Sequence, residues 1–329
     1  MSNPPASSAE PARQASGVAA REGTLAPAPE GDHAAEALAP ALSGEFFRVG
    51  GIGCYVAGRG PPLLLVHSVN AAASAAEMRP LYEQYRHTRT VFAPDLPGFG
   101  RSERSARRYT PKIMTDAIEI ILSAIQERMG PQPVDALALS LGCEFLARAA
   151  AKRPECWGRL ALVSPTGFRG RARRGAPGTT RLIPAMYAIV SYPLWSERLF
   201  RGLVRPGVVR YFLGRTWGSK AIDEALWAYC VESAHQPGAR YAPLDFLSGG
   251  LFSADILDIY EALSQPVWMS HGVRGDFTDY RGQRVVAARP NWSFSTFQTG
   301  ALPYFEEPLA FFRAFDAFLA GAPVEPASP

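Results

Sequence analysis

Short apolar runs recur along most of the chain, and amphipathic stretches separate them. The runs at 62–66, 90–93, 134–139, 160–163, 267–270 and 292–297 predict strands. The stretches at 74–85, 111–129, 141–152, 280–288 and 308–319 have the periodicity of helices. A continuous apolar run is typical of a strand that is buried on both faces of a sheet. Alternation of such strands with helices predicts βαβ units and a mostly parallel α/β sheet with helices on both faces.

Two segments depart from this alternation. Residues 1–42 are rich in Ala, Pro, Ser, Gly and Glu and contain no aromatic residue, so we expect a disordered tail. The core then begins with a predicted hairpin at 45–49 and 52–57. Residues 169–264 lack buried-strand runs and contain amphipathic helical stretches at 182–195, 196–212 and 220–233. We therefore expect a helical lid at 169–264 between two parts of one core, 43–168 and 265–329.

The sequence Ala-Leu-Ser-Leu-Gly at 138–142 joins a predicted buried strand to a predicted helix. It resembles the Gly-x-Ser-x-Gly nucleophile elbow, in which a serine occupies a strained strand-to-helix turn. The residues two before and two after the serine must be small, because strand and helix approach closely there. Ala138 and Gly142 meet this need, and the N-terminus of the helix favours negative charge beside Ser140. The other interpretation is an ordinary turn with a solvent-exposed serine.

Two further motifs extend the resemblance to the α/β-hydrolase fold superfamily. The segment 91–102, Val-Phe-Ala-Pro-Asp-Leu-Pro-Gly-Phe-Gly-Arg-Ser, is similar to a strand and loop of that superfamily, and His67-Ser-Val-Asn70 resembles its His-Gly-x loop. The resemblance implies a serine hydrolase with Ser140 as nucleophile and the backbone N–H groups of Val69 and Leu141 as the oxyanion hole. Ser68 replaces the usual glycine of the loop. Asn70 is expected to line the substrate pocket.

The same resemblance implies an acid and a histidine later in the chain. Asp276 is the best candidate for the acid, although it follows Gly272 one residue later than usual, and Asp279 is a weaker candidate. Asp276 could instead cap the following helix. The family pattern Gly-His-x-Pro-x-x-Glu-x-Pro aligns with residues 300–308, where Ala301 stands in the place of the histidine. Alanine cannot take the proton of a serine hydroxyl, so Ala301 is expected only to line the pocket.

Other side chains could supply the missing base. His271 and His67 both end predicted parallel strands, where α/β sites form. Of these, His271 is the favoured substitute base because Asp276 could orient it. The alternative is that each histidine bonds the backbone at the end of its strand. Cys143 is expected to be a small packing residue of the helix and not a nucleophile.

Composition limits the classes of partner and compartment. The net charge of +4 is too small to imply a nucleic-acid partner, and no cofactor or metal site is indicated. The four cysteines form no metal or disulfide pattern, which favours a reduced, cytoplasmic protein. No apolar stretch is long enough to span a membrane, and the oligomeric state is not indicated.

The first half of the predicted lid is rich in arginine and aromatic residues, with Glu197 as its single acid. Its arginines are Arg169, Arg171, Arg173, Arg174, Arg181, Arg198, Arg201, Arg205, Arg210 and Arg215. One hypothesis is a membrane-facing surface, but the favoured interpretation is a solvated basic face above core aromatics.

Three functions fit these observations. The first is a serine-type hydrolase of an ester or related carbonyl substrate of apolar character, with a non-standard base. The second is a catalytically silent protein that binds a small apolar or amphipathic ligand on a hydrolase scaffold. The third is lyase or isomerase chemistry without a cofactor. Fold alone does not decide among them.

Overall fold

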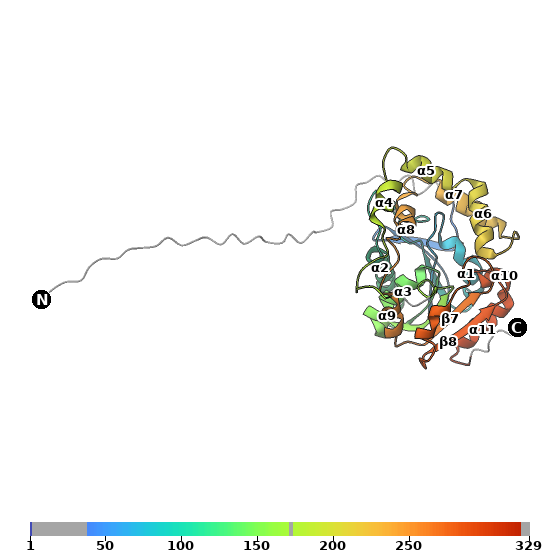
Figure 1. The fold of residues 1–329 in the computed structure, drawn as a ribbon. Helices are drawn as coiled ribbons and strands as arrows, with labels where there is room; N and C mark the ends of the chain where they lie inside the picture. The colour runs from blue at the N-terminus through green and yellow to red at the C-terminus, as the bar shows by residue number, and fades with distance from the viewer. Residues whose placement is uncertain (2–37, 171–173, 324–329) are drawn as a thin grey trace. The chain divides into compact units, whose positions relative to one another are not determined.

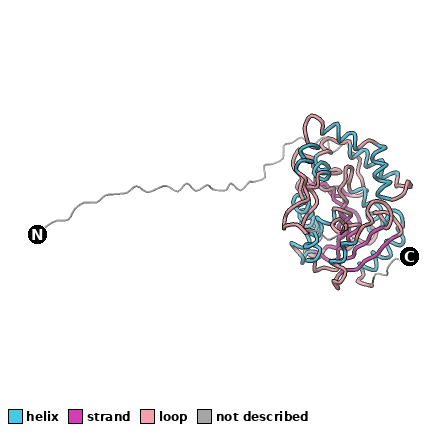
Figure 2. The backbone as a smooth tube through the Cα atoms, viewed as in Figure 1, coloured by secondary structure: helices cyan, strands magenta, loops and turns pink. Residues whose placement is uncertain are grey.

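Eight strands form one sheet in the computed structural model of the chain, which describes residues 1, 38–170 and 174–323 (Figure 2). The strands are β1 (Glu45–Val49), β2 (Ile52–Gly58), β3 (Pro62–Val66), β4 (Thr90–Pro94), β5 (Val134–Leu139), β6 (Trp157–Val163), β7 (Val267–Gly272) and β8 (Trp292–Phe297). Their order is β1-β2-β4-β3-β5-β6-β7-β8. In this sheet the pairs β1–β2 and β2–β4 are antiparallel, and the other pairs of neighbouring strands are parallel. The predicted mostly parallel α/β sheet is confirmed.

Alternate residues of the strands enter two separate hydrophobic cores. Leu64 and Val66 of β3 belong to one core, and Leu63 and Leu65 belong to the other. Successive side chains of a strand point to opposite faces, so the sheet is covered on both sides. The first core includes α2 (Pro111–Met129), α3 (Gly142–Lys152) and α9 (Ile256–Ala262), and the second includes α1 (Arg79–Tyr85), α10 (Pro303–Glu306) and α11 (Pro308–Leu319).

Local sequence signals explain where the longest helix begins and ends. The Thr110 hydroxyl accepts a hydrogen bond from the Ile113 N–H at 3.3 Å, and Pro111 occupies the first turn of α2. Gly130 follows α2 with a positive φ of 84°, a conformation that glycine adopts without strain. Helix α2 therefore has the bounds predicted from the sequence.

A helical insertion separates β6 from β7. Its helices are α4 (Pro184–Val190), α5 (Ser196–Leu203), α6 (Pro206–Trp217), α7 (Glu224–Ala234), α8 (Tyr241–Leu247) and α9. Figure 1 draws α4, α5, α6 and α7 together, away from β7 and β8. The single helix expected at 196–212 is divided into α5 and α6, because Pro206 cannot continue a hydrogen-bonded helix and instead begins a new one.

The helix expected at 280–288 is also different in the structure. A short 3-10 helix, η3 (Arg281–Val285), takes its place. Gly282 explains the difference, since its N–H donates to the Phe168 carbonyl at 2.7 Å and a methyl group on it would lie 2.5 Å from that oxygen. This contact outside the segment competes with a regular helix. Within the described residues no helix has the length and apolar character needed to cross a membrane.

The N-terminal segment meets the core earlier than the sequence indicated. The chain divides into two units after Asp32, and Met1 is the only described residue of the first unit. Most of the expected tail, residues 2–37, lies outside the described residues. Leu38, Ala41 and Leu42 were expected to belong to the tail, yet they are buried in the second hydrophobic core. The ordered core therefore begins at Leu38 and not near Glu45.

Removing these buried residues should destabilise the fold. Burying a leucine side chain contributes about 2 kcal/mol, so a variant that lacks residues 1–42 should have a melting temperature lower by roughly 10 °C. Calorimetry would measure the difference. A variant that lacks only residues 2–36 is the control, and its composition predicts an unchanged melting temperature. Equal melting temperatures for both variants would show that the buried contacts of 38–42 contribute nothing.

Candidate active site

A cavity of about 130 Å³ lies between the insertion and the loops that follow β3, β5, β6, β7 and β8. Its lining comprises Ser68, Val69, Asn70, Glu77, Leu139, Ser140, Leu141, Ser164, Thr166, Leu213, Thr216, Trp217, Leu226, Phe246, Phe252, Phe277, Ala301 and Leu302. The carboxyl ends of parallel strands are where ligand sites form in such sheets. The cavity brings together five residues singled out from the sequence: Ser140, Val69, Leu141, Asn70 and Ala301.

Ser140 occupies a strained turn between β5 and α3. Its φ of 52° is in the left-handed region, which costs a non-glycine residue about 1–3 kcal/mol. The surroundings hold this conformation, because the Ser140 N–H donates to the Val163 carbonyl of β6 at 2.8 Å. A methyl group on Gly142 would lie 2.4 Å from the His67 carbonyl oxygen, so only glycine fits there. This is the backbone geometry that a nucleophile elbow requires.

Two backbone N–H groups beside Ser140 are without a partner. Val69 and Leu141 are buried residues of the cavity lining. The N–H groups of both form no hydrogen bond with any part of the chain that the structure describes. Buried backbone donors are nearly always satisfied, so a pair of free donors at one cavity favours binding of an anionic or carbonyl oxygen.

A buried glutamate holds the loop that contains Val69. The Glu77 carboxylate accepts hydrogen bonds from the Ser68 N–H at 2.8 Å, the Ser68 hydroxyl at 2.9 Å and the Asn70 amide at 2.9 Å. The Asn70 amide also donates to the Ser68 hydroxyl at 3.1 Å. Because these donors flank Val69 on both sides, Glu77 determines the direction of the Val69 N–H.

Glu77 is also an ionisable group of the cavity itself. Burial raises the pKa of its carboxyl group above the ordinary value, and the hydrogen bonds from Ser68 and Asn70 partly offset this rise. Sequence analysis did not single out Glu77. The pattern Ser74-x-x-Glu77 is typical of a capping box, which would turn the glutamate toward its own helix. In the structure Ser74 does cap η1 (Ala75–Met78), while Glu77 turns away to Ser68.

His67 cannot act as a base in this arrangement. Its Nε2 accepts a hydrogen bond from the Leu96 N–H at 2.8 Å, so the ring proton is on Nδ1, which lies 2.5 Å from the Ser68 carbonyl oxygen. Both ring nitrogens are therefore used by the backbone. Burial lowers the pKa of His67 to about 4. The contacts of His67 are therefore those of a histidine that forms hydrogen bonds with the backbone at the end of its strand.

Ala301 lies at the cavity wall, and the end of α6 is bonded to its backbone. The Ala301 N–H donates to the Thr216 carbonyl at 3.0 Å, and the Ala301 carbonyl accepts from the Ser164 hydroxyl at 2.8 Å. Glu306, the glutamate of the family pattern at 300–308, accepts from the Gly300 N–H at 2.6 Å. Hydrogen bonds to α6, to Ser164 and within the loop thus hold the segment that contains Ala301 at the cavity.

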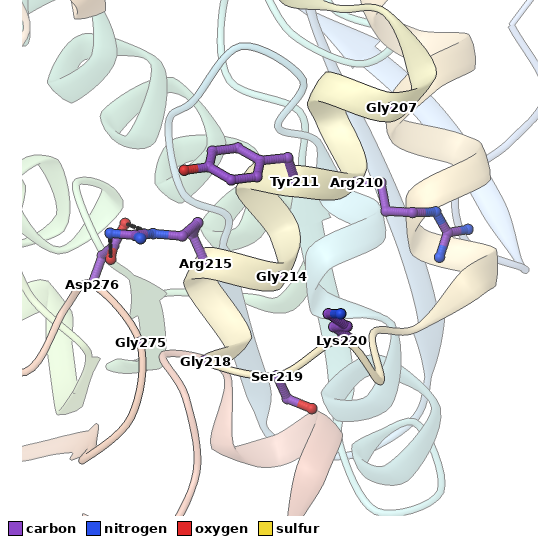
Figure 3. Close-up of a pocket in the computed structure, with 10 residues that line it drawn as sticks. All are labelled: Gly207, Arg210, Tyr211, Gly214, Arg215, Gly218, Ser219, Lys220, Gly275 and Asp276. Atoms are coloured by element: carbon purple, nitrogen blue, oxygen red, sulfur yellow. Dashed lines mark hydrogen bonds and ion pairs between the residues drawn. The ribbon is translucent and has the colours of Figure 1, made fainter.

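Asp276 is not part of the cavity lining. Its carboxylate pairs with Arg215 of α6, with 2.8 Å between Nε and Oδ2, and both side chains are exposed (Figure 3). Its N–H also donates to the Arg215 carbonyl at 3.1 Å. These residues border a separate surface cleft of about 890 Å³. Asp279 is likewise occupied elsewhere, since its carboxylate accepts from Arg281 and from the Gly170 N–H.

His271 also lies outside the cavity lining. Its ring stacks on Tyr280 with centroids 4.0 Å apart, and its Nδ1 lies 3.0 Å from the Gly272 carbonyl oxygen. Burial lowers the pKa of His271. Among the histidines that the structure describes, none contributes to the cavity lining.

Cys143 is buried in the first hydrophobic core, and its thiol contacts the Ala138 carbonyl oxygen at 3.2 Å. Burial raises the pKa of this thiol well above its ordinary value, so it stays protonated and packs as a small apolar group.

The comparisons with known proteins agree with the fold. The family model described as alpha/beta hydrolase fold matches residues 61–200. Structural neighbours cover most of the chain: the 2-hydroxy-6-oxo-6-phenylhexa-2,4-dienoate hydrolase of Rhodococcus sp. strain RHA1 has a TM-score of 0.65, at 17% identity over 84% of this chain and 97% of its own. The epoxide hydrolase CorEH has a TM-score of 0.65, at 20% identity over 85% of this chain and 99% of its own. The chain therefore has the α/β-hydrolase fold.

Sequence relatives either have low identity over most of the chain or match only about a third of it. The uncharacterized protein Rv2715 of Mycobacterium tuberculosis is 24% identical over 281 residues, which is 80% of this chain and 76% of that protein. The 2-hydroxymuconate semialdehyde hydrolase of Pseudomonas sp. strain CF600 is 30% identical over 112 residues, which is 33% of this chain and 38% of that enzyme. One of these relatives is uncharacterized, and the other is a hydrolase matched over about a third of this chain.

Proposed function

We propose that the protein is a serine-type hydrolase that acts on a small ester or related carbonyl compound of largely apolar character. The observation that carries this proposal is the position of Ser140, in a strained turn beside the two free N–H groups of Val69 and Leu141. An apolar wall contributed by Leu213, Trp217 and Phe246 favours an apolar acyl group. The cavity volume of about 130 Å³ favours a short one.

In the proposed reaction the Ser140 hydroxyl oxygen attacks the carbonyl carbon of the substrate. The carbonyl oxygen becomes an oxyanion, which the N–H groups of Val69 and Leu141 stabilise. When the intermediate collapses, the leaving group departs and an acyl-serine remains. Water then attacks the acyl-serine in the same way and releases the acid.

We assign Glu77 as the acceptor of the Ser140 proton, in the place of a histidine. The Ser68 hydroxyl lines the cavity and donates to Glu77 at 2.9 Å, so it can receive a proton from Ser140 as it gives its own to the carboxylate. Glu77 later returns the proton along the same path to the leaving group. A base with a raised pKa is better matched to a serine hydroxyl than an ordinary carboxylate. The proposal does not use Asp276 or His271.

A protein that binds a small ligand without turnover is the second candidate. The specific observation in its favour is Ala301, together with a cavity lining that contains no described histidine. Such a protein would keep the cavity and the free N–H groups but lack an activated serine.

Reaction with a small fluorophosphonate distinguishes the two functions. Because such a probe reacts with activated serines, we expect a single covalent adduct on Ser140, located by mass spectrometry of the intact protein and its peptides. Ser140→Ala should remove the adduct, while Ser164→Ala, at another serine of the cavity lining, should not. Absence of an adduct on the folded protein would favour the binding protein.

A further inference from the structure

Exposed apolar side chains are concentrated in one part of the insertion. Nine of the fifteen large exposed apolar residues in the described chain fall within 183–212. We call these nine the α4–α6 apolar face: Ile183, Met186, Ile189, Tyr192, Leu194, Trp195, Leu199, Tyr211 and Phe212. Figure 1 draws these helices across the upper end of the fold, with α5 between α4 and α6. Exposed apolar side chains gathered on neighbouring helices favour an interaction surface in this part of the insertion.

Helix α4 favours the presence of a binding partner on this face. Its sequence, Pro-Ala-Met-Tyr-Ala-Ile-Val, has no charged residue, yet none of its residues is buried. Leu194 is 76% exposed and Ile189 is 61% exposed. Only Tyr187 and Val190 of this helix are partly buried, so its own fold covers little of its apolar surface.

The aromatic residues of this region divide into two groups. Phe200 and Trp217 are buried in the second hydrophobic core. Tyr192 and Trp195 are exposed and contact each other with centroids 4.5 Å apart, and Tyr211 and Phe212 are exposed beside each other on α6. Aromatic rings with polar tips are typical of the interface between a bilayer and water.

Unpaired positive charge surrounds the same face. Arg198, Arg205 and Lys220 are exposed and form no ion pair with any residue in the described part of the chain. Glu197, the only acid from 183 to 217, is already paired with Arg201 and Arg240. The net charge available to a partner is therefore positive.

A broad cleft continues this basic surface along α6. It has a volume of about 890 Å³ and is lined by Tyr211, Arg210, Arg215 and Lys220, among others (Figure 3). Arg210 and Arg215 are paired with Glu224 and Asp276, so Lys220 is the cation of this cleft that has no ion-pair partner among the described residues.

We propose that the α4–α6 apolar face docks on the surface of an anionic phospholipid bilayer, with Arg198, Arg205 and Lys220 toward the lipid headgroups. Apolar and aromatic side chains enter the interfacial region, and the cations meet the negative surface potential. No transmembrane helix is required. The inference is independent of the chemistry of Ser140, because none of the nine residues lines the Ser140 cavity.

Co-sedimentation with vesicles tests the proposal on the full chain. We expect binding to vesicles of phosphatidylcholine with about one-third phosphatidylglycerol at low salt, and much weaker binding to phosphatidylcholine alone or at high salt. Ile189→Ser/Leu194→Ser should lower the affinity for anionic vesicles on the order of 10-fold or more. The matched control is Leu309→Ser, because Leu309 is 80% exposed on α11 and outside the face.

A second pair of variants tests the charges. Arg198→Gln/Arg205→Gln should weaken binding on the order of 10-fold and reduce its salt dependence. Arg59→Gln/Arg313→Gln removes two exposed arginines elsewhere and should leave binding unchanged. Absence of vesicle binding, or equal loss in both pairs, would overturn the proposal. A second result would also overturn the proposal: the wild type does not bind vesicles and is a dimer in solution, and Ile189→Ser/Leu194→Ser is a monomer. In that case a second copy of the chain would cover the face.

Discussion

Replacement of Ala301 by histidine is expected to raise the hydrolysis of small activated esters on the order of 10²-fold. Ala301 lines the cavity that contains Ser140, so an imidazole at this position would add the proton carrier of the family pattern. We expect a rate increase at the lower end of what general acid–base catalysis contributes, because Asp276 is bound to Arg215 and cannot orient the imidazole ring. A short substrate such as p-nitrophenyl acetate suits the cavity volume.

Three controls make this result interpretable. Ala301→Gln introduces a side chain of similar size without a titratable group and should give no gain. Ser140→Ala in the Ala301→His background should abolish the gain. The added rate should increase with pH through the pKa of the new imidazole, because only the neutral ring accepts a proton. If Ala301→His folds normally and shows no increase, then position 301 does not mark a missing base.

Replacement of Glu77 by glutamine is expected to lower the esterase rate and the rate of fluorophosphonate labelling by roughly 10²-fold or more. Glutamine retains the size of the side chain but cannot accept a proton, and its NH₂ group faces donors from Ser68 or Asn70. In the wild type the rate should rise with pH through a pKa above the ordinary value for glutamate, because only the ionised carboxylate is a base. In Glu77→Gln this limb of the pH profile should vanish.

Glu144 provides a matched control for this variant. It is a second buried glutamate, whose carboxylate accepts from the Thr166 hydroxyl and from the Ser253 N–H, and it does not line the cavity. Burial raises the pKa of Glu144 to about 7. Glu144→Gln should leave the acid limb of the rate profile in place. An unchanged profile in Glu77→Gln, with normal folding, would remove Glu77 from the proposed mechanism.

The double variant Ala301→His/Glu77→Gln separates two roles of Glu77. If Glu77 acts only as a base, the imidazole at 301 should restore activity to the level of Ala301→His. If Glu77 also directs the Val69 N–H through its bonds to Ser68 and Asn70, activity should remain well below that level. Non-additive behaviour of this kind is expected for residues that act as a unit.

The sheet could be predicted from the sequence because its signals are local. A strand such as 62–66 is a continuous apolar run, and α2 has a cap, a proline and a terminal glycine at its ends. The insertion was less predictable. Its helices α8 and α9 were not expected, and the division at Pro206 was not recognised, because packing on the core and not periodicity determines these elements.

The parts of the site that depend on backbone conformation could be predicted from the sequence. The parts that depend on which distant residue a side chain contacts could not. The turn at Ser140 follows from small residues at 138 and 142, which the sequence displays directly. The partner of Asp276 is Arg215, 61 residues away, and no local pattern indicates that ion pair. Glu77 illustrates the same limit, since its contacts are with Ser68, nine residues before it, and no local pattern indicates them.

Hydrogen bonds join α6 to the loops after β7 and β8, and they limit whether the insertion can be removed or exchanged as a unit. The Thr216 and Arg215 carbonyls are the acceptors for the N–H groups of Ala301 and Asp276. Excising the insertion would leave both donors without a partner and uncover Gly300, whose α carbon packs against the backbone of residues 216 and 217. The insertion is thus part of the framework that shapes the edge of the sheet where the Ser140 cavity lies. Exchange of this segment between relatives would have to carry the two loops with it.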